Sequence, residues 1–179
     1  ALIRSIAGTQ GDHGRATYNL QTSYLPGANL RHPGFGSVVV HEKENHSDLP
    51  AYISISGQAP RASYLGQQCE AYYVSNPGDK DPYLAFPEGI AQLRGNKRLE
   101  TLARFNQRFG AGNPDPRLAS NQESIEDAVR LMRSPALEAF ELATVPQETL
   151  DRYGNTAFGR GALLARRLVD KGVRFVQVN

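Results

Sequence analysis

The chain has 179 residues, of which 40% are hydrophobic and 21% are charged, the ordinary balance of a globular protein with one sizeable core. Its formal net charge of +2 is too small to indicate a protein that binds nucleic acids or membrane surfaces. No apolar run approaches the roughly 20 residues of a membrane-spanning helix. A single cysteine, Cys69, excludes an internal disulfide framework and leaves the redox compartment open.

The first 27 residues combine a strand pattern, a polar turn and a helix pattern. The apolar residues within 1–6 predict a buried strand, and residues 8–14 predict a turn. Helical spacing on one face follows, carried by Ala16, Leu20 and Tyr24. A strand, a polar turn and a helix present reactive side chains at the carboxyl edge of an α/β sheet.

The start of that helix carries three residues that suit an anionic ligand: Asp12, His13 and Arg15. Free backbone N–H groups and the positive end of the helix dipole favour an anion there. We therefore expect a catalytic group in which Arg15 clamps the anion and His13 acts as base or ligand. The alternative is that Asp12 only caps the helix and His13 is a surface residue.

The next elements are shorter. Leu25-Pro26-Gly27 ends the first helix, and residues 27–36 read as loop. Residues 35–44 fit a helix, although their three consecutive valines also suit a strand. Residues 51–56 predict a second buried strand.

Residues 57–95 show no sustained helical or strand period and are rich in proline, glycine and tyrosine. A loop of that length inside a compact domain is often functional. Its tyrosines either line a pocket or anchor an irregular segment to the core: Tyr64, Tyr72, Tyr73 and Tyr83.

Residues 96–160 predict a helical insert. The first expected helix spans 97–109, capped by Asn96 and ended by Gly110, and the second follows a Ser120–Glu123 capping box. Two shorter helices are expected over 136–143, after Ser134-Pro135, and over 146–153. The arginines between Arg94 and Arg117 suggest either a phosphate-binding face or the solvated side of the insert. We favour the solvated side and expect no nucleic-acid partner, because Glu100, Asp115 and Glu123 dilute the charge.

The clearest amphipathic helix spans 161–171, with Leu163, Leu164 and Leu168 directed inward. Gly172 ends it, and a strand over 173–178 follows at once. This is the αβ half of a parallel crossover unit, so we predict an α/β fold.

Several segments, taken in order, resemble one family. They are DHGRATYNLQTSYLPG, PGFGSVVVHE, LPAYISI, YLGQQCEAYYV and YGNTAFGRGALLARRLVDKGVRFVQVN. Together they resemble domain of unknown function 1501, a sulfatase-like family placed in the alkaline phosphatase-like superfamily. One departure is Ser23, where the family usually has glycine. The resemblance implies a helix over 35–44 and a partial alkaline phosphatase-like domain of sheet and helices with a helical insert.

The resemblance also implies chemistry. Members of that superfamily typically hydrolyse phosphate or sulfate esters with divalent metal ions, zinc, calcium or similar. Aligning TSYLP with the TGxxP stretch of sulfatases puts His13 near their modified nucleophile, and this chain has no cysteine, serine or threonine there. His13 is thus a metal ligand, a nucleophile or a general acid. Family members are often exported, which implies an exported or periplasmic location.

No carboxylate–histidine cluster with metal-ligand spacing occurs in the sequence, and we expect His32 and His46 to be solvated loop residues. The chain begins and ends on strand patterns, whereas domain termini usually lie in loose surface segments. We therefore expect a single incomplete α/β domain, a fragment of a longer protein. The family resemblance implies that further metal ligands lie beyond Asn179.

Three functions remain open. The first is a metal-dependent hydrolase of small phosphoric or sulfuric esters, inactive as the isolated chain. The second is a non-catalytic module that binds a polyanion, such as a sulfated glycan, through its tyrosine-rich loop. The third is a structural or cell-surface role without a small ligand.

Overall fold

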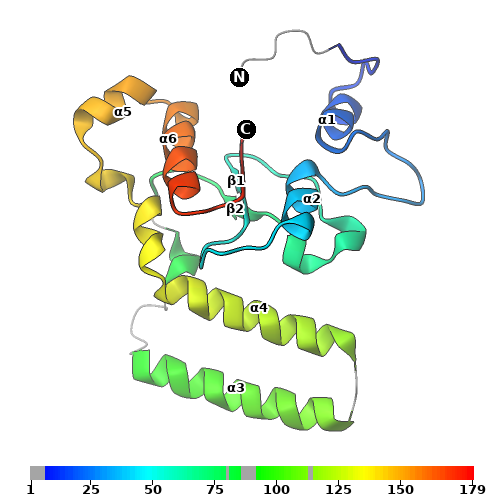
Figure 1. Ribbon diagram of the computed structural model, residues 1–179, viewed down its shortest axis with the longest axis vertical. Helices are drawn as coiled ribbons and strands as arrows, with labels where there is room; N and C mark the ends of the chain where they lie inside the picture. Colours follow the sequence, from blue (N-terminus) through cyan, green and yellow to red (C-terminus); the bar gives the residue numbers. More distant parts are fainter. Residues whose placement is uncertain (1–6, 80, 86–91, 113–114) are drawn as a thin grey trace.

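The computed structural model of the chain describes residues 7–79, 81–85, 92–112 and 115–179 (Figure 1). Its centre is a three-stranded parallel sheet in the order β2–β1–β3. The strands are β1 (Tyr52–Ile55), β2 (Tyr72–Val74) and β3 (Phe175–Val178). The fold is therefore α/β, as the sequence predicted.

The central strand β1 is buried along its whole length. Ile53 and Ile55 point to the face covered by α6 (Ala157–Asp170), where they join the main apolar cluster with the leucines of that helix. Helix and sheet approach closely at Gly161, where an added Cβ would lie 3.0 Å from Val178 Cγ1 and 3.4 Å from Ile55 Cγ2. A small residue is required at this crossing because a longer side chain would separate the two layers.

The opposite face of the sheet carries Tyr52 and is covered by α2 (Phe35–Glu42) (Figure 1). An added Cβ at Gly36 would lie 2.4 Å from the Tyr52 ring, so this glycine lets α2 lie directly on the ring. The ring packs edge-on against Phe175, with centroids 5.3 Å apart, and its hydroxyl donates to Gln177 Oε1 at 2.8 Å. Burial raises the pKa of the Tyr52 phenol to about 12, and Glu70 adds to the shift.

The predicted αβ crossover is confirmed. Leu163, Leu164 and Leu168 of α6 are buried, and the turn to β3 passes through Gly172 at a φ of 91°. That left-handed conformation favours glycine, which has no Cβ to clash with the backbone. The helix starts at Ala157, one turn before the predicted Gly161, because Thr156 accepts a hydrogen bond from the Gly159 N–H and caps it there.

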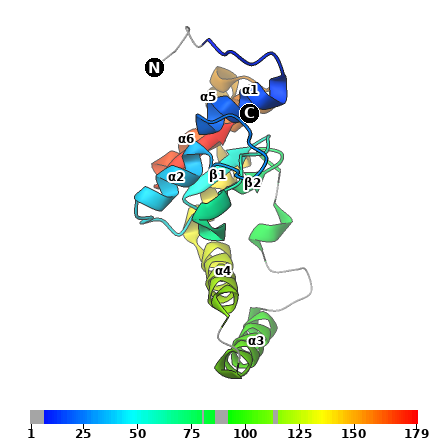
Figure 2. The same ribbon diagram turned by 90° about the vertical axis from the view of Figure 1, so that its right-hand side faces the viewer.

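Two long helices form an arm that projects from the sheet (Figures 1 and 2). They are α3 (Gln92–Gly112) and α4 (Pro116–Arg133). The chain returns to the sheet through the 3₁₀ turns η4 (Pro135–Phe140) and η5 (Leu142–Thr144), and then α5 (Gln147–Tyr153). Within the described ranges, no helix is long and apolar enough to cross a bilayer.

The predicted boundaries of the arm helices are wrong, although their existence is confirmed. Asn96 and Gly110 lie inside α3 and neither caps nor ends it. The expected capping box of Ser120 and Glu123 lies inside α4, which begins instead at Pro116 behind Asp115. The Asp115 carboxylate accepts from the Arg117 N–H and side chain, which holds the pKa of Asp115 below its usual range. The Asp115 cap and the proline at the first helical position therefore determine where α4 begins, and the predicted Ser120–Glu123 capping box does not.

The stretch 57–95 is not structureless. It contains β2, whose three residues pair in parallel with β1, and the short 3₁₀ turns η1 (Ser63–Leu65), η2 (Gln67–Cys69) and η3 (Pro82–Leu84). Three residues are too few to show a strand period in sequence. The helix predicted over 136–143 is likewise present mainly as the 3₁₀ turn η4, while the predicted 146–153 helix is confirmed as α5.

Near the amino terminus, the predicted strand over 1–6 lies outside the described residues. The predicted helix is present as α1 (His13–Thr22), but Tyr24 lies beyond its end and Leu20 is 53% exposed, so the three residues do not form one helix face. Ser23 ends α1 at a φ of 64°. This left-handed conformation costs a non-glycine residue roughly 1–2 kcal/mol. The turn is formed nevertheless, with serine at the position where the resembling family usually has glycine.

The predictions of α2 over 35–44 and β1 over 51–56 are confirmed.

Leu168→Ala should lower the free energy of unfolding by about 2–5 kcal/mol, because Leu168 is fully buried and its truncation leaves a cavity. Val169→Ala is the matched control on the same helix, since Val169 is 56% exposed and should change stability by less than about 0.5 kcal/mol. Urea unfolding followed by circular dichroism measures both. Equal losses in the two variants would contradict the assigned burial.

Tyr52→Phe should remove part of the alkaline unfolding of the chain. The folded-state pKa of Tyr52 is raised, so its contribution to stability is complete below pH 10 and is lost as the pH rises to about 12. The lost contribution is on the order of 2–3 kcal/mol. Urea titrations across that range should show a smaller fall in the free energy of unfolding for Tyr52→Phe than for the parent chain. Parallel curves would show that Tyr52 is not the titrating group.

Candidate functional site

The carboxyl ends of the three parallel strands meet at one edge of the sheet, where α/β proteins place their ligands. Asn179 closes this edge beside β1. Its backbone N–H donates to Ile55 O at 3.1 Å, and its side-chain amide donates to Ser54 Oγ at 3.2 Å. Ser54 in turn donates to Gly57 O at 2.7 Å. An added Cβ at Gly57 would lie 2.4 Å from Asn179 Cβ, so only glycine fits there.

Ser56 lies between these residues in an unusual conformation. Its φ of 60° is left-handed, and its N–H donates to Val74 O at 2.8 Å, which joins β1 to β2. Its hydroxyl oxygen is buried and has no hydrogen-bond partner among the described residues. Strained non-glycine residues of this kind cluster at functional sites. Sequence reasoning missed this edge; the glycine directly after the predicted strand was the available signal.

The three residues predicted to be catalytic lie together on the first turn of α1. Asp12 caps the helix, and its Oδ1 accepts from the Arg15 N–H at 2.8 Å. The side chains of His13 and Arg15 are exposed and make no hydrogen bond or ion pair within the described residues. The capping alternative is thus confirmed for Asp12, and the catalytic role of the group stays a prediction. Both views place α1 at the end of the long axis where Asn179 also lies (Figures 1 and 2).

Two of the four loop tyrosines line a cavity of about 410 Å³ at the carboxyl end of β2. Tyr73 and Tyr83 contribute aromatic surface there, and Asn76, Asp79 and Asp81 contribute polar groups. Tyr72 has an anchoring role instead. Its hydroxyl donates to Asp81 Oδ2 at 2.7 Å, and burial together with this bond raises the pKa of the Tyr72 phenol. Each of the two predicted roles of the tyrosines therefore applies to part of the set.

His32 is not the solvated loop residue that the sequence predicted. Its ring stacks on Tyr24 with centroids 3.7 Å apart, and Tyr64 approaches it edge-on. Its backbone N–H donates to the Tyr18 hydroxyl at 2.6 Å. These contacts join the segment after α1 back to the helix. His46, by contrast, is exposed and lies 3.9 Å from Glu44, as expected of a loop residue.

The described part of the chain contains no group of three or more histidine, cysteine, aspartate or glutamate side chains that could hold a metal ion. Cys69 is free and buried, and burial raises the pKa of its thiol. It is therefore less nucleophilic than an exposed cysteine.

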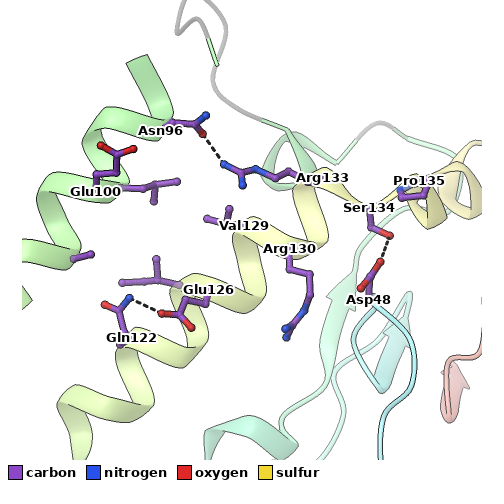
Figure 3. Close-up of a pocket in the computed structure, with 13 residues that line it drawn as sticks. Asp48, Asn96, Glu100, Gln122, Glu126, Val129, Arg130, Arg133, Ser134 and Pro135 are labelled. Carbon is purple, nitrogen blue, oxygen red and sulfur yellow. Dashed lines mark hydrogen bonds between the residues drawn. The ribbon is translucent and has the colours of Figure 1, made fainter. Parts of the chain in front are cut away.

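A hollow of about 760 Å³ lies between the arm helices (Figure 3). Leu99 of α3 and Ile125 and Val129 of α4 form its apolar part. Its polar groups bind one another: Arg133 donates to Asn96 Oδ1 at 2.6 Å, and Ser134 donates to Asp48 Oδ2 at 3.1 Å. The polar groups of this groove therefore serve to hold the arm helices together and to attach the arm to the segment before β1. We assign the groove to loose packing within the arm.

Asp12→Ala should destabilise α1 by about 1 kcal/mol through loss of its cap, whereas Asp12→Asn should keep the helix, since asparagine caps equally well. Hydrogen exchange of the α1 amides measures the difference. The global unfolding transition should hardly move, because α1 contributes a single buried side chain, Thr22. Equal amide protection in both variants would exclude the capping role.

A family model described as "Protein of unknown function (DUF1501)" matches residues 1–179, the full length of the chain. Comparison with curated proteins and with solved structures found no match. The matched range includes α1, the three strands and the arm, so it covers every element described above. The chain belongs to the DUF1501 family.

Proposed function

We propose that this chain contributes the substrate-binding edge of a metal-dependent hydrolase of phosphoric or sulfuric esters, of the sulfatase-like, alkaline phosphatase-like kind. One observation carries the proposal. The exposed His13 and Arg15 of α1 lie at the end of the molecule that also holds the carboxyl edge of the parallel sheet, where Ser56 is strained (Figures 1 and 2). Both the edge and a helix start are places where α/β proteins bind anions.

The residues of α1 support specific roles. The Arg15 N–H is already bonded to the Asp12 cap, so an ester anion would take the Arg15 guanidinium and the earlier N–H groups of the first turn. A guanidinium binds two oxygens of a phosphate or sulfate group at once. His13 would hold or deliver a proton, or ligate an ion through its imidazole.

A divalent ion, when bound, would polarise the ester and activate a nucleophile. The described residues do not form a complete ligand set for such an ion. We therefore assign no step through the metal to these residues, and propose that His13 at most joins ligands from elsewhere.

A second candidate, a glycan-binding module, is favoured by the cavity at the end of β2. Tyr73 and Tyr83 offer aromatic faces for sugar rings, and Asn76 and Asp81 offer amide and carboxylate groups for hydroxyls. Two carboxylates on the lining, from Asp79 and Asp81, suit sugar hydroxyls better than sulfate groups, which they repel.

The test measures bound metal by elemental analysis, and turnover of aryl phosphate and aryl sulfate esters. It uses the 179-residue chain and the longest natural chain that contains it. In the active form, His13→Ala should lower kcat/KM by about a hundredfold or more, and Arg15→Gln should mainly raise KM. His46→Ala is the control, since His46 is an exposed loop histidine that should leave both constants unchanged.

A folded natural chain with neither metal nor turnover would overturn the hydrolase. In that case, glycan binding that survives metal removal and His13→Ala, but is lost in Tyr73→Ala, would support the binding module. Tyr24→Ala controls for loss of a partly exposed tyrosine outside the cavity.

A further inference from the structure

The arginines of the arm are sorted by the fold into two groups. On α4, Arg117 pairs with Asp115 and Arg130 pairs with Asp127, while Arg133 bonds to Asn96. On α3, Arg94, Lys97, Arg98, Arg104 and Arg108 make no ion pair within the described residues. Glu100, the only acidic residue of α3, lines the groove toward α4. The sequence predicted that acidic residues would offset these cations. On the rest of the α3 surface, they do not.

The same surface of α3 exposes large apolar side chains. Leu102, Phe105 and Phe109 are 41%, 64% and 60% exposed, and their spacing of three and four residues puts them on one face. Arg94 and Arg98 continue that face by the same spacing. Leu102 and Phe105 share a shallow hollow of about 400 Å³ with Arg94, Lys97 and Arg98. Asn96, Leu99 and Ala103 occupy the other face, toward α4. We name the exposed side, with its centre at Leu102, Phe105 and Phe109 and its cations at Arg94, Lys97, Arg98 and Arg108, the basic face.

We propose that the basic face docks the protein onto a bilayer surface that contains anionic phospholipid. A lipid surface takes up both kinds of side chain found there, because headgroup phosphates attract the cations and the acyl boundary receives leucine and phenylalanine. A nucleic acid would use the cations and leave the exposed apolar side chains without a partner. A second copy of the chain is disfavoured because two basic faces repel each other.

The place of α3 in the molecule supports a flat partner. In both views α3 lies at one end of the long axis, with α4 between it and the sheet (Figures 1 and 2). No described element extends beyond it at that end. A plane can therefore meet the length of the helix without contacting the sheet, and the docking leaves the carboxyl edge at the opposite end accessible.

Vesicle co-sedimentation tests the proposal, with phosphatidylcholine alone and with phosphatidylcholine mixed with phosphatidylglycerol. The chain should sediment with the anionic vesicles only, and less so as salt is raised. Arg98→Gln should weaken partitioning about fivefold, since one cation at an anionic surface contributes about that factor. Phe105→Ser should weaken it about tenfold through lost apolar insertion.

Two variants serve as matched controls and should bind as the parent does. Phe158→Ser removes a phenylalanine that is 63% exposed on α6, and Lys43→Gln removes an exposed cation just after α2. Circular dichroism confirms that each variant is folded. Absence of vesicle binding overturns the proposal, as does an equal loss in variants and controls. Binding to polyglutamate or duplex DNA without vesicle binding also overturns it, and would assign the face to an acidic protein or a nucleic acid.

Discussion

Complete burial of β1 is the constraint on which the rest of the structure depends. A central strand of a parallel sheet is covered on both faces, so each of its side chains must meet another layer. Ile53 and Ile55 meet the leucines of α6, and Tyr52 meets α2. Two glycines, Gly36 and Gly161, let these helices approach. The two helices are far apart in sequence, so the core forms only when both ends of the chain are in place.

The same constraint determines how firmly each part of the candidate site is held. Ser54 faces the buried interior, and its hydroxyl links Gly57 to the Asn179 amide across more than a hundred residues of sequence. The sheet edge is therefore fixed by long-range contacts. On α1, by contrast, the contact of Asp12 is local, to the N–H of Arg15 three residues away. The start of α1 is therefore held by a local contact, whereas the sheet edge is held by contacts between distant parts of the chain.

The sequence predicted the elements whose local signals agreed with one another, although the capping signals at Asn96 and Ser120 gave wrong helix boundaries. The leucine spacing of α6 and the glycine after it identified the helix and strand that carry the core, and Asp12 was recognisable as a cap. Features that depend on distant residues were not readable. The three residues of β2 form a strand because Ile53 to Ile55 offer them backbone partners, and the stacking of His32 depends on Tyr24 and Tyr64. The strain at Ser56 likewise arises only when the sheet edge closes.

The arm shows why a charge count over the whole chain misleads. A net charge of +2 averages over residues that the fold separates. Asp115 and Asp127 neutralise arginines of α4, and Glu100 lies in the groove. Helical periodicity then places four of the α3 cations, those of the basic face, around Leu102, Phe105 and Phe109. Because electrostatic attraction is screened beyond about 8–10 Å, a partner at this face meets the local cluster of cations rather than the net charge. A nearly neutral chain can therefore present a strongly basic surface.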